Sequence, residues 1–257
     1  MIKVFVGGTE EHDLPIKVLE QSILTRTNEP CTVYSIHEEL KARNRTIPVP
    51  RDKRQRPVTS FSFHRFMIPE LCSWQGKGIY LDSDQLVQHD IAEMWNTPFP
   101  DGANVLTTGG WQSAVMLIDC EKARWNIDDL VDKMNRGEMG YRHLMNLRHS
   151  FASVAGALDP RWNCKDKPEP NGCFLMHYTH MRMQPWLTIK HPYGPLWVSE
   201  LRKHLALGTI TNEDVLASVD SSHVRPSLAI LAGRDVPGLQ EADRGFVFPD
   251  DRRKGKR

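Results

Sequence analysis

Two aspartates, Asp82 and Asp84, directly follow a short apolar run, at residues 79–81. An ionised carboxylate at the buried end of a strand costs free energy unless it is paired or binds a metal. Residues at positions i and i+2 of an extended segment project from the same face, so both carboxylates would point to one side. Two hard oxygen ligands in this arrangement suit Mg²⁺ or Mn²⁺ held against a substrate phosphate better than an all-protein Ca²⁺ cage.

Other polar or glycine-rich positions also follow predicted strands. They are residues 7–9 (Gly-Gly-Thr), the glycine pair at 109–110, and His177. Ligands of open α/β sheets bind at the carboxyl ends of the strands, where these positions would meet. A histidine such as His177 is, by itself, more simply explained as a core residue. Together with Asp82 and Asp84 it becomes a candidate third metal ligand, with the remaining positions left to phosphate oxygens or water.

The elements that must position these side chains are predicted from hydrophobic periodicity. Strands are expected at residues 2–6, 32–36, 79–81, 105–108, 113–119 and 174–178. Helices are expected at residues 14–24, 62–71, 90–95, 121–136, 198–207 and 212–218. Alternating strands and helices predict one mostly parallel central sheet with helices on both faces, followed by a helical carboxyl-terminal part.

The segment 41–57 has a different composition, with seven Lys or Arg, three Pro and a single Asp. It shows no periodicity, which favours a solvent-exposed loop. Two alternatives stay open, a lid over the site and a contact with an acidic partner.

Composition excludes several classes of protein. The 257 residues carry 33 Lys and Arg against 32 Asp and Glu, a balance that does not suggest nucleic-acid binding. The odd number of cysteines, five, and the lack of a Cys-x-x-Cys pattern indicate reduced thiols of a cytosolic protein. Cys164 and Cys173 flank a loop and could pair if oxidised.

No secretory signal is apparent and no stretch approaches the roughly 20 apolar residues that span a bilayer, so we expect a soluble, cytoplasmic protein. The charged tail at residues 250–257 is expected to be disordered. Its basic cluster could contact anionic lipid, although solvation alone is the simpler explanation.

Six ordered segments resemble family 8 glycosyltransferases, the family of glycogenin and of bacterial lipopolysaccharide galactosyltransferases. Residues 62–71, 79–84 and 91–95 are similar to the central block of that family. Residues 113–118, 158–163 and 177–186 follow in the family's order. The resemblance covers about residues 1–197, and the ordered set is more specific than any single motif.

The resemblance implies a GT-A fold over residues 1–197, with a helical extension at 198–249 packed on it. It also implies a metal-dependent transfer of a sugar from a nucleotide-diphosphate donor, usually UDP-linked, with retention of the anomeric configuration. Mn²⁺ or Mg²⁺ would be held by Asp82, Asp84 and His177. The acceptor would be a hydroxyl of a glycan, a lipid-linked sugar or a small molecule.

Further roles follow from the same resemblance. Gly7, Gly8 and Thr9 match the loop that cradles the nucleoside, and Ser83 would contact the ribose or uracil through its backbone. Arg65 matches a basic position near the donor, for which a salt bridge on a helix surface is the alternative.

The sequence departs from the family pattern where the diphosphate and the sugar would bind. The family's diphosphate-binding lysine is absent after His177, and Arg182 or Gln184 could replace it. Gln112 stands where the family has Asn, and Tyr141-Arg142 stands where it has Asp-Gln. Gln112 is therefore our candidate for the polar group beside the anomeric carbon.

These departures leave a second interpretation open, a degenerate relative that binds a nucleotide or sugar without turnover. A nucleotidyltransferase is a third interpretation. It would be expected to carry a basic glycine-rich loop after the first strand, whereas this chain has Glu10 and Glu11 there.

Overall fold

The computed structural model describes residues 1–257 except 110–111, 148–151, 237, 245 and 247–257. Its strands are β1 (Ile2–Gly7), β2 (Cys31–Ser35), β3 (Lys77–Asp82), β4 (Gln85–Val87), β5 (Val105–Thr107), β6 (Val115–Asp119), β7 (Val154–Ala155), β8 (Cys164–Lys165) and β9 (Leu175–His177). Its α-helices are α1 (Asp13–Leu24), α2 (Ile36–Ala42), α3 (Ile68–Leu71), α4 (Ile91–Trp95), α5 (Ile127–Asn135), α6 (Tyr141–Met145), α7 (Gly194–Leu207), α8 (Asn212–Asp220) and α9 (Leu239–Ala242). Short 3₁₀ helices are η1 (Glu10–His12), η2 (Lys53–Gln55), η3 (His64–Phe66), η4 (Pro160–Asn163) and η5 (Pro226–Ala232).

The central sheet has six strands in the order β2-β1-β3-β6-β5-β7. Strand β1 pairs in parallel with β2 and β3, and β5 pairs in parallel with β7. Strand β6 runs antiparallel to both β3 and β5. The ends of β3 and β5 and the start of β6 therefore meet at one edge, which confirms the predicted mostly parallel sheet.

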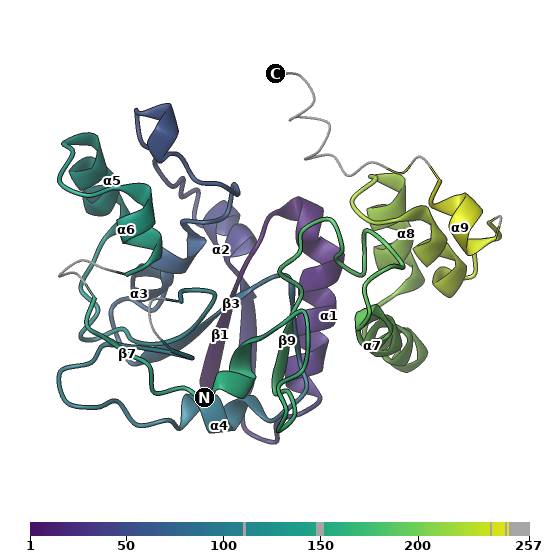
Figure 1. Ribbon diagram of the computed structural model, residues 1–257, viewed down its shortest axis with the longest axis horizontal. Coiled ribbons are helices and arrows are strands. Elements are labelled where there is room, and N and C mark those ends of the chain that lie inside the picture. Colours follow the sequence, from purple (N-terminus) through teal and green to yellow (C-terminus); the bar gives the residue numbers. More distant parts are fainter. Residues whose placement is uncertain (110–111, 148–151, 237, 245, 247–257) are drawn as a thin grey trace.

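Alternating side chains of the central strands feed two separate cores. Val4 and Val6 pack on the face covered by α1 and α4, whereas Phe5 and Tyr80 pack on the face covered by α2, α3, α5 and α6. This two-residue period is what a strand buried on both faces requires. Figure 1 shows α1 on one side of β1 and β3, with α2 and α3 on the other side.

The segment 174–178, expected as the last strand of the central sheet, lies instead in a second sheet. Its strand β9 forms the middle of a three-stranded sheet with β4 and β8. The chain turns at Ser83 and Asp84 after β3, so β4 leaves the central sheet and pairs antiparallel with β9. That pairing places His177 opposite Gln85.

The carboxyl-terminal helices pack on the rest of the chain through a third core. Trp186, Trp197 and Leu201 join Leu14 and Val18 of α1 in this core. Figure 1 shows α7 and α8 beside α1. The predicted charged tail at residues 250–257 lies outside the described residues.

Three predicted boundaries were wrong for local reasons. The expected helix at 62–71 is divided into η3 and α3, because Pro69 has no N–H to continue a helix from the preceding turn. The expected helix at 121–136 begins only at Ile127, where the Asn126 side chain accepts a hydrogen bond from the Asp128 N–H. The strand expected to end at Ile36 gives way there to α2.

The basic segment 41–57 is more than a solvated loop. Its first residues complete α2, and Arg45 forms salt bridges with Glu70 and with Asp128. Gln55 accepts a hydrogen bond of 2.6 Å from the Tyr141 N–H. The segment is thereby fastened to α5 and α6 along its length.

No helix among the described residues is long and apolar enough to cross a bilayer.

Candidate metal and donor site

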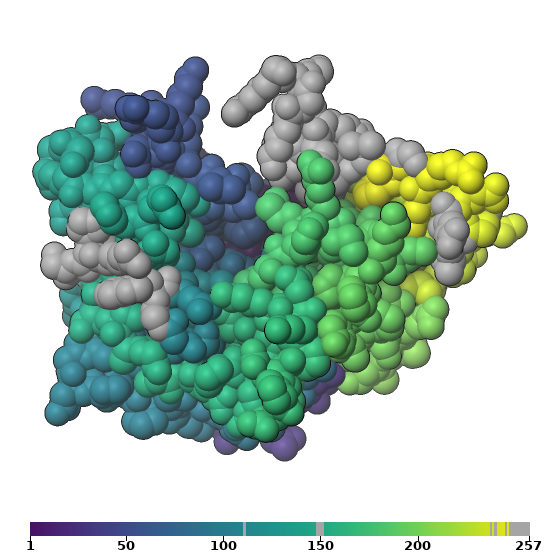
Figure 2. All heavy atoms as spheres, in the orientation of Figure 1, coloured from purple at the N-terminus to yellow at the C-terminus, as the bar shows by residue number. Residues whose placement is uncertain are grey.

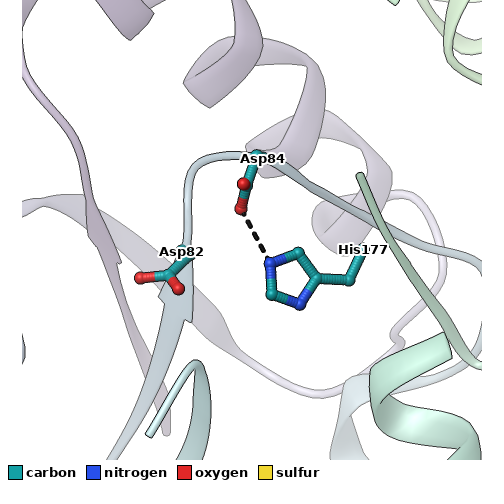
Figure 3. Close-up of side chains that lie close together, drawn as sticks. All are labelled: Asp82, Asp84 and His177. Atoms are coloured by element: carbon teal, nitrogen blue, oxygen red, sulfur yellow. Dashed lines mark ion pairs between the residues drawn. The ribbon is translucent and has the colours of Figure 1, made fainter. Parts of the chain in front are cut away.

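Asp82, Asp84 and His177 converge although they come from different elements. Asp82 ends β3, Asp84 lies in the turn before β4, and His177 ends β9. One potential ligand atom of each lies within 4.8 Å of the others, and Figure 3 shows the three side chains close together, with the His177 ring directed at Asp84. The pairing of β4 with β9 therefore brings His177 close to Asp82 and Asp84, as expected from their positions at the ends of predicted strands.

The Asp82 carboxylate is held through one of its two oxygens. Its Oδ1 accepts hydrogen bonds from Arg65 Nη2 at 2.9 Å and from the Tyr80 hydroxyl at 2.5 Å. Tyr80 and Asp82 are two residues apart on β3 and so share the face on which Arg65 is buried. Burial raises the pKa of Asp82 even though Arg65 counteracts it.

Arg65 is buried, and its guanidinium donates hydrogen bonds to other residues of the chain. Besides Asp82, it donates to the Ser62 carbonyl at 3.0 Å and to the Ser113 carbonyl and hydroxyl at 2.7 and 2.8 Å. Burial is the largest single influence and lowers the pKa of Arg65, but Asp82 acts together with Tyr80, Tyr141 and Asp84 and the net result is a raised pKa. The burial of Arg65 rules out the alternative of a salt bridge on a helix surface, and its predicted place near the donor stays a prediction. Arg65 joins Asp82 to the start of β6.

Asp84 is held by Gln184, a residue predicted to bind the donor. Gln184 Nε2 donates to Asp84 Oδ2 at 3.1 Å and to the Tyr178 carbonyl at 3.2 Å. Asp84 Oδ1 lies 3.1 Å from His177 Nε2 and is shown by the dashed line in Figure 3. Among the described residues this buried oxygen accepts no hydrogen bond of proper geometry.

The far side of the His177 ring is fixed by an amide. His177 Nδ1 lies 2.8 Å from Asn163 Oδ1, and Asn163 Nδ2 donates to Gln112 Oε1 at 3.0 Å. An amide oxygen can only accept, so Nδ1 carries the proton that points to Asn163. Burial is the largest single influence and lowers the pKa of His177, but the carboxylates of Asp84 and Asp82 together outweigh it and the pKa is raised.

These observations fit a divalent cation. Asp84 Oδ1 is buried without a hydrogen bond, and the only hydrogen bonds that fix Asp82 within the described structure reach Oδ1 and leave Oδ2 for another ligand. A neutral His177 would add Nε2, since Asn163 orients the other nitrogen. Two carboxylate oxygens and an imidazole nitrogen are a donor set that suits Mn²⁺.

The glycines before η1 are required by packing. A Cβ on Gly7 would lie 2.3 Å from the Tyr80 hydroxyl, and one on Gly8 would lie 2.8 Å from Ile16 Cδ1 and 3.2 Å from Ser83 Cβ. Ser83 donates its N–H to the Gly7 carbonyl at 3.0 Å. The end of β1 and the Asp82–Asp84 turn are thus packed directly together.

The remaining residues predicted to bind the donor are Thr9, Gln112 and Arg182. Thr9 Oγ1 lies 3.0 Å from His12 Nδ1, and Gln112 is exposed at the end of the Asn163 chain of contacts. Arg182 is exposed in the turn at residues 181–183 after β9. Figure 2 shows a hollow in the surface between the dark blue segment of the basic loop and the green segment that follows β9.

Two supporting residues were missed from the sequence. The sequence predicts Tyr80 only as part of the apolar strand at 79–81, and Asn163 only as part of the segment 158–163 that resembles family 8. The two-residue spacing of Tyr80 and Asp82 on one strand is a signal that could have found the first. For Asn163, nothing in the sequence around η4 indicates that its side chain contacts His177, which lies 14 residues further along the chain.

The chain matches the model of glycosyl transferase family 8 over residues 12–189. It belongs to this family. The first strand and its glycines precede the matched region, and α7 follows it.

Two curated proteins have local sequence similarity to the chain. Protein CDI of Arabidopsis thaliana is 32% identical over 93 residues, which cover 36% of this chain and 35% of that protein. Glycosyltransferase 8 domain-containing protein 1 of Xenopus laevis is 43% identical over 51 residues, which cover 20% of this chain and 14% of that protein. The matches span about a third or less of these relatives.

Solved structures share the architecture. The glycosyltransferase GlyE of Streptococcus pneumoniae TIGR4 superposes with a TM-score of 0.56 at 18% identity, covering 77% of this chain and 60% of that chain. The galactosyltransferase LgtC, in complex with donor and acceptor sugar analogues, gives a TM-score of 0.54 at 14% identity and covers 82% and 100%. At such identities the likeness shows the fold, which is the GT-A fold.

Proposed function

We propose that this chain transfers a sugar from a nucleotide-diphosphate donor, UDP-linked, to an acceptor hydroxyl with retention of configuration. The observation that carries the proposal is the convergence of Asp82, Asp84 and His177, in which a buried oxygen of Asp84 faces His177 Nε2 at 3.1 Å and accepts no hydrogen bond of proper geometry among the described residues. A divalent ion bound there, Mn²⁺ or Mg²⁺, would stabilise the charge that develops on the diphosphate as the glycosidic bond breaks.

The chain's own residues have three roles in this proposal. Asp82, Asp84 and His177 hold the metal, and Arg65, Gln184 and Asn163 fix their orientation through the contacts described above. The nucleoside lies against the backbone at residues 7–9 and 83. Gln112, whose oxygen is occupied by Asn163, presents its amide N–H groups beside the sugar and orients it for the acceptor.

The test is the release of UDP or GDP from a panel of nucleotide sugars, with Mn²⁺ and with a chelator. Asp84→Asn is the decisive variant because it removes a ligand charge without leaving the buried Arg65 unpaired, as Asp82→Ala would. We expect a loss of about 10³-fold in release. Asp101→Ala, at an exposed carboxylate, is the matched control.

The same experiment separates transfer from binding without turnover. The missing acidic residue at the Tyr141-Arg142 position is the observation that favours the second candidate, a relative that only binds a nucleotide or sugar. Metal-dependent UDP binding without release from any donor would support that candidate. If neither UDP nor Mn²⁺ raises the melting temperature, the site assignment is wrong, because a ligand of the native state must stabilise it.

A further inference from the structure

A polar cavity of about 220 Å³ lies next to the candidate metal site. Its lining includes Thr108, Gln112, Asn163, Lys165, Lys167 and Glu169. Two of these residues, Asn163 and Gln112, also form the chain of contacts that leads from His177 Nδ1. The cavity is therefore linked to the site through Asn163, on the side of the imidazole ring that faces away from Asp84.

The position of Lys165 follows from the sheet. Strand β8 pairs in parallel with β9, and Lys165 is the register partner of His177. Partners in register on neighbouring strands project from the same face of a sheet. The pairing that delivers the imidazole to the metal ligands thus also delivers an ammonium group beside it.

The backbone that carries both lysines is fixed by the residue between them. Asp166 donates its N–H to the His177 carbonyl at 2.9 Å. Its carboxylate accepts hydrogen bonds from the Thr179 hydroxyl and the His180 N–H, and His191 Nε2 lies 3.2 Å from it. Asp166 has a φ of 56°, a left-handed conformation that such contacts must stabilise in a residue other than glycine. Lys165 and Lys167 leave this fixed point toward the cavity.

The cavity carries a net positive charge. Within the described structure neither Lys165 nor Lys167 forms a salt bridge, and the single acidic residue of the lining is Glu169. The neutral groups beside them, Thr108, Gln112 and Asn163, offer hydrogen-bonding atoms. Such a lining suits a negatively charged, hydroxyl-bearing group better than a neutral one.

We propose that this cavity recognises a carboxylate on the sugar of the donor, so that the chain uses a nucleotide-linked uronic acid. The inference rests on the proposed function, because it takes the donor to be held by the metal at Asp82, Asp84 and His177. The diphosphate belongs at the Nε2 side of His177, where the metal ligands meet. Because the proposed function assigns the nucleoside to residues 7–9 and 83, the sugar is the part of the donor left to reach the cavity, whose lining contacts His177 through Asn163 on the Nδ1 side.

The experiment compares donors that differ at one carbon. Affinities of UDP, UDP-glucose, UDP-glucuronate, UDP-galactose and UDP-galacturonate are measured by calorimetry with Mn²⁺. For at least one of the two pairs we expect the uronate to bind about tenfold or more tightly than the neutral sugar, since a charge-assisted contact is gained. Lys165→Met and Lys167→Met, singly and together, should abolish that preference and leave the affinity for UDP unchanged. Lys133→Met, on the exposed face of α5, is the matched control.

Each other outcome overturns the inference in a distinct way. Equal affinity within both pairs would show that no carboxylate is recognised, while UDP binding would still support the proposed function. A preference that survives in the double variant would place the recognition elsewhere. A fall in the affinity for UDP itself would assign the lysines to the diphosphate. Absence of Mn²⁺-dependent UDP binding in the unaltered protein would instead refute the proposed function.

Discussion

Asp82 at the candidate site and Glu200 in α7 are both largely buried carboxylates, and each is paired with an arginine. At the site, Asp82 receives both of its hydrogen bonds on Oδ1. In the carboxyl-terminal helices, Glu200 uses both oxygens, each 2.7 Å from a nitrogen of Arg26, and His204 Nε2 lies 3.1 Å from Oε1. The exposed fractions of the two acidic side chains are similar, 13% and 8%.

The pKa values of the two carboxyl groups are nevertheless shifted in opposite directions. Burial raises the pKa of Asp82 despite Arg65. Burial also acts to raise the pKa of Glu200, but the hydrogen bonds and charge of Arg26 outweigh it and lower the value to about 2. In the Arg26–Glu200 pair both carboxylate oxygens are hydrogen-bonded, and the pair stabilises the packing of α7 on the rest of the chain. In the Arg65–Asp82 pair Oδ2 stays available to a further ligand, and such an arrangement costs stability.

The largest effect is expected from Arg65→Met. The change removes the partner of Asp82 and leaves the carbonyls of Ser62 and Ser113 without a donor from this side chain. Breaking one partner of a buried ion pair costs about 3–5 kcal/mol, so the free energy of unfolding should fall by that amount. Chemical denaturation measures it.

Arg65→Lys is the companion variant. It keeps a positive charge but lacks the planar fork that reaches Asp82 and Ser113 together, so an intermediate loss is expected. A loss below about 1 kcal/mol for Arg65→Met would contradict the role of Arg65 as a buried clamp.

Glu200→Gln should have the next largest effect, a loss of about 2 kcal/mol in unfolding free energy. The amide keeps the size of the side chain but loses the two charged hydrogen bonds to Arg26, which is itself 24% exposed and can regain water. Glu29→Gln, at an exposed position, is the control.

Mn²⁺-dependent UDP binding distinguishes the Arg26–Glu200 pair from the Arg65–Asp82 pair. Mn²⁺-dependent UDP binding by folded Glu200→Gln should equal that of the unaltered protein, because Glu200 contacts Arg26 and His204 rather than the proposed metal ligands. If binding falls together with stability, the contrast drawn between a structural and a functional carboxylate does not hold.

The sequence predicted the convergence of Asp82, Asp84 and His177 better than it predicted the residues that hold them in place. Asp82 and Asp84 are near neighbours in the chain, and a strand period carries one of them to the end of β3, so the motif is local. Its supports are not local: Arg65 is 17 residues from Asp82, and Gln184 is 100 residues from Asp84. Arg26 and Glu200 are 174 residues apart and sit in patterns that predict only helix and loop.

The fold follows the same rule. Strands β1 and β3 and helix α1 were predicted because their apolar periods are long and regular. The placement of β9 in a second sheet was not predicted, because its apolar run is equally compatible with either sheet. Only the turn at Ser83 and Asp84 and the pairing with β4 decide it.

Asn163→Ala tests whether the contact that orients His177 matters as much for metal binding as the contacts that hold Asp82 and Asp84. Loss of the acceptor for His177 Nδ1 frees the ring to rotate, and removal of such a partner typically weakens metal binding by 10- to 100-fold. We expect a decrease of about tenfold in Mn²⁺ affinity, because Asp82 and Asp84 remain. Calorimetry with Mn²⁺ and UDP measures it.

The control for this variant is the exposed amide of Asn96, changed to Ala. An unchanged Mn²⁺ affinity for Asn163→Ala would mean that His177 is not a ligand. A loss of stability equal to that of Glu200→Gln would mean that Asn163 acts mainly in the fold.

The smallest predicted effect is a loss of stability with falling pH that the Arg26–Glu200 pair should produce and the Arg65–Asp82 pair, in which the carboxyl pKa is raised, should not. The pKa of Glu200 is about 2 in the folded protein against an ordinary value of 4.5. A lowered carboxyl pKa gives stability that is fully present above the unfolded value and is lost as the pH falls toward the folded value. Between pH 6 and pH 4 the contribution should fall by about 0.8 kcal/mol.

Denaturation of the unaltered protein and of Glu200→Gln at the two pH values isolates this contribution. The difference in unfolding free energy between the two proteins should be smaller at pH 4 than at pH 6, since the glutamine cannot titrate while all other groups are shared. A difference that is constant over this range would mean that Glu200 is not held in its charged form by Arg26. The two carboxylate pairs would then differ in position only, and the fully satisfied pair would have no electrostatic advantage over the one at the site.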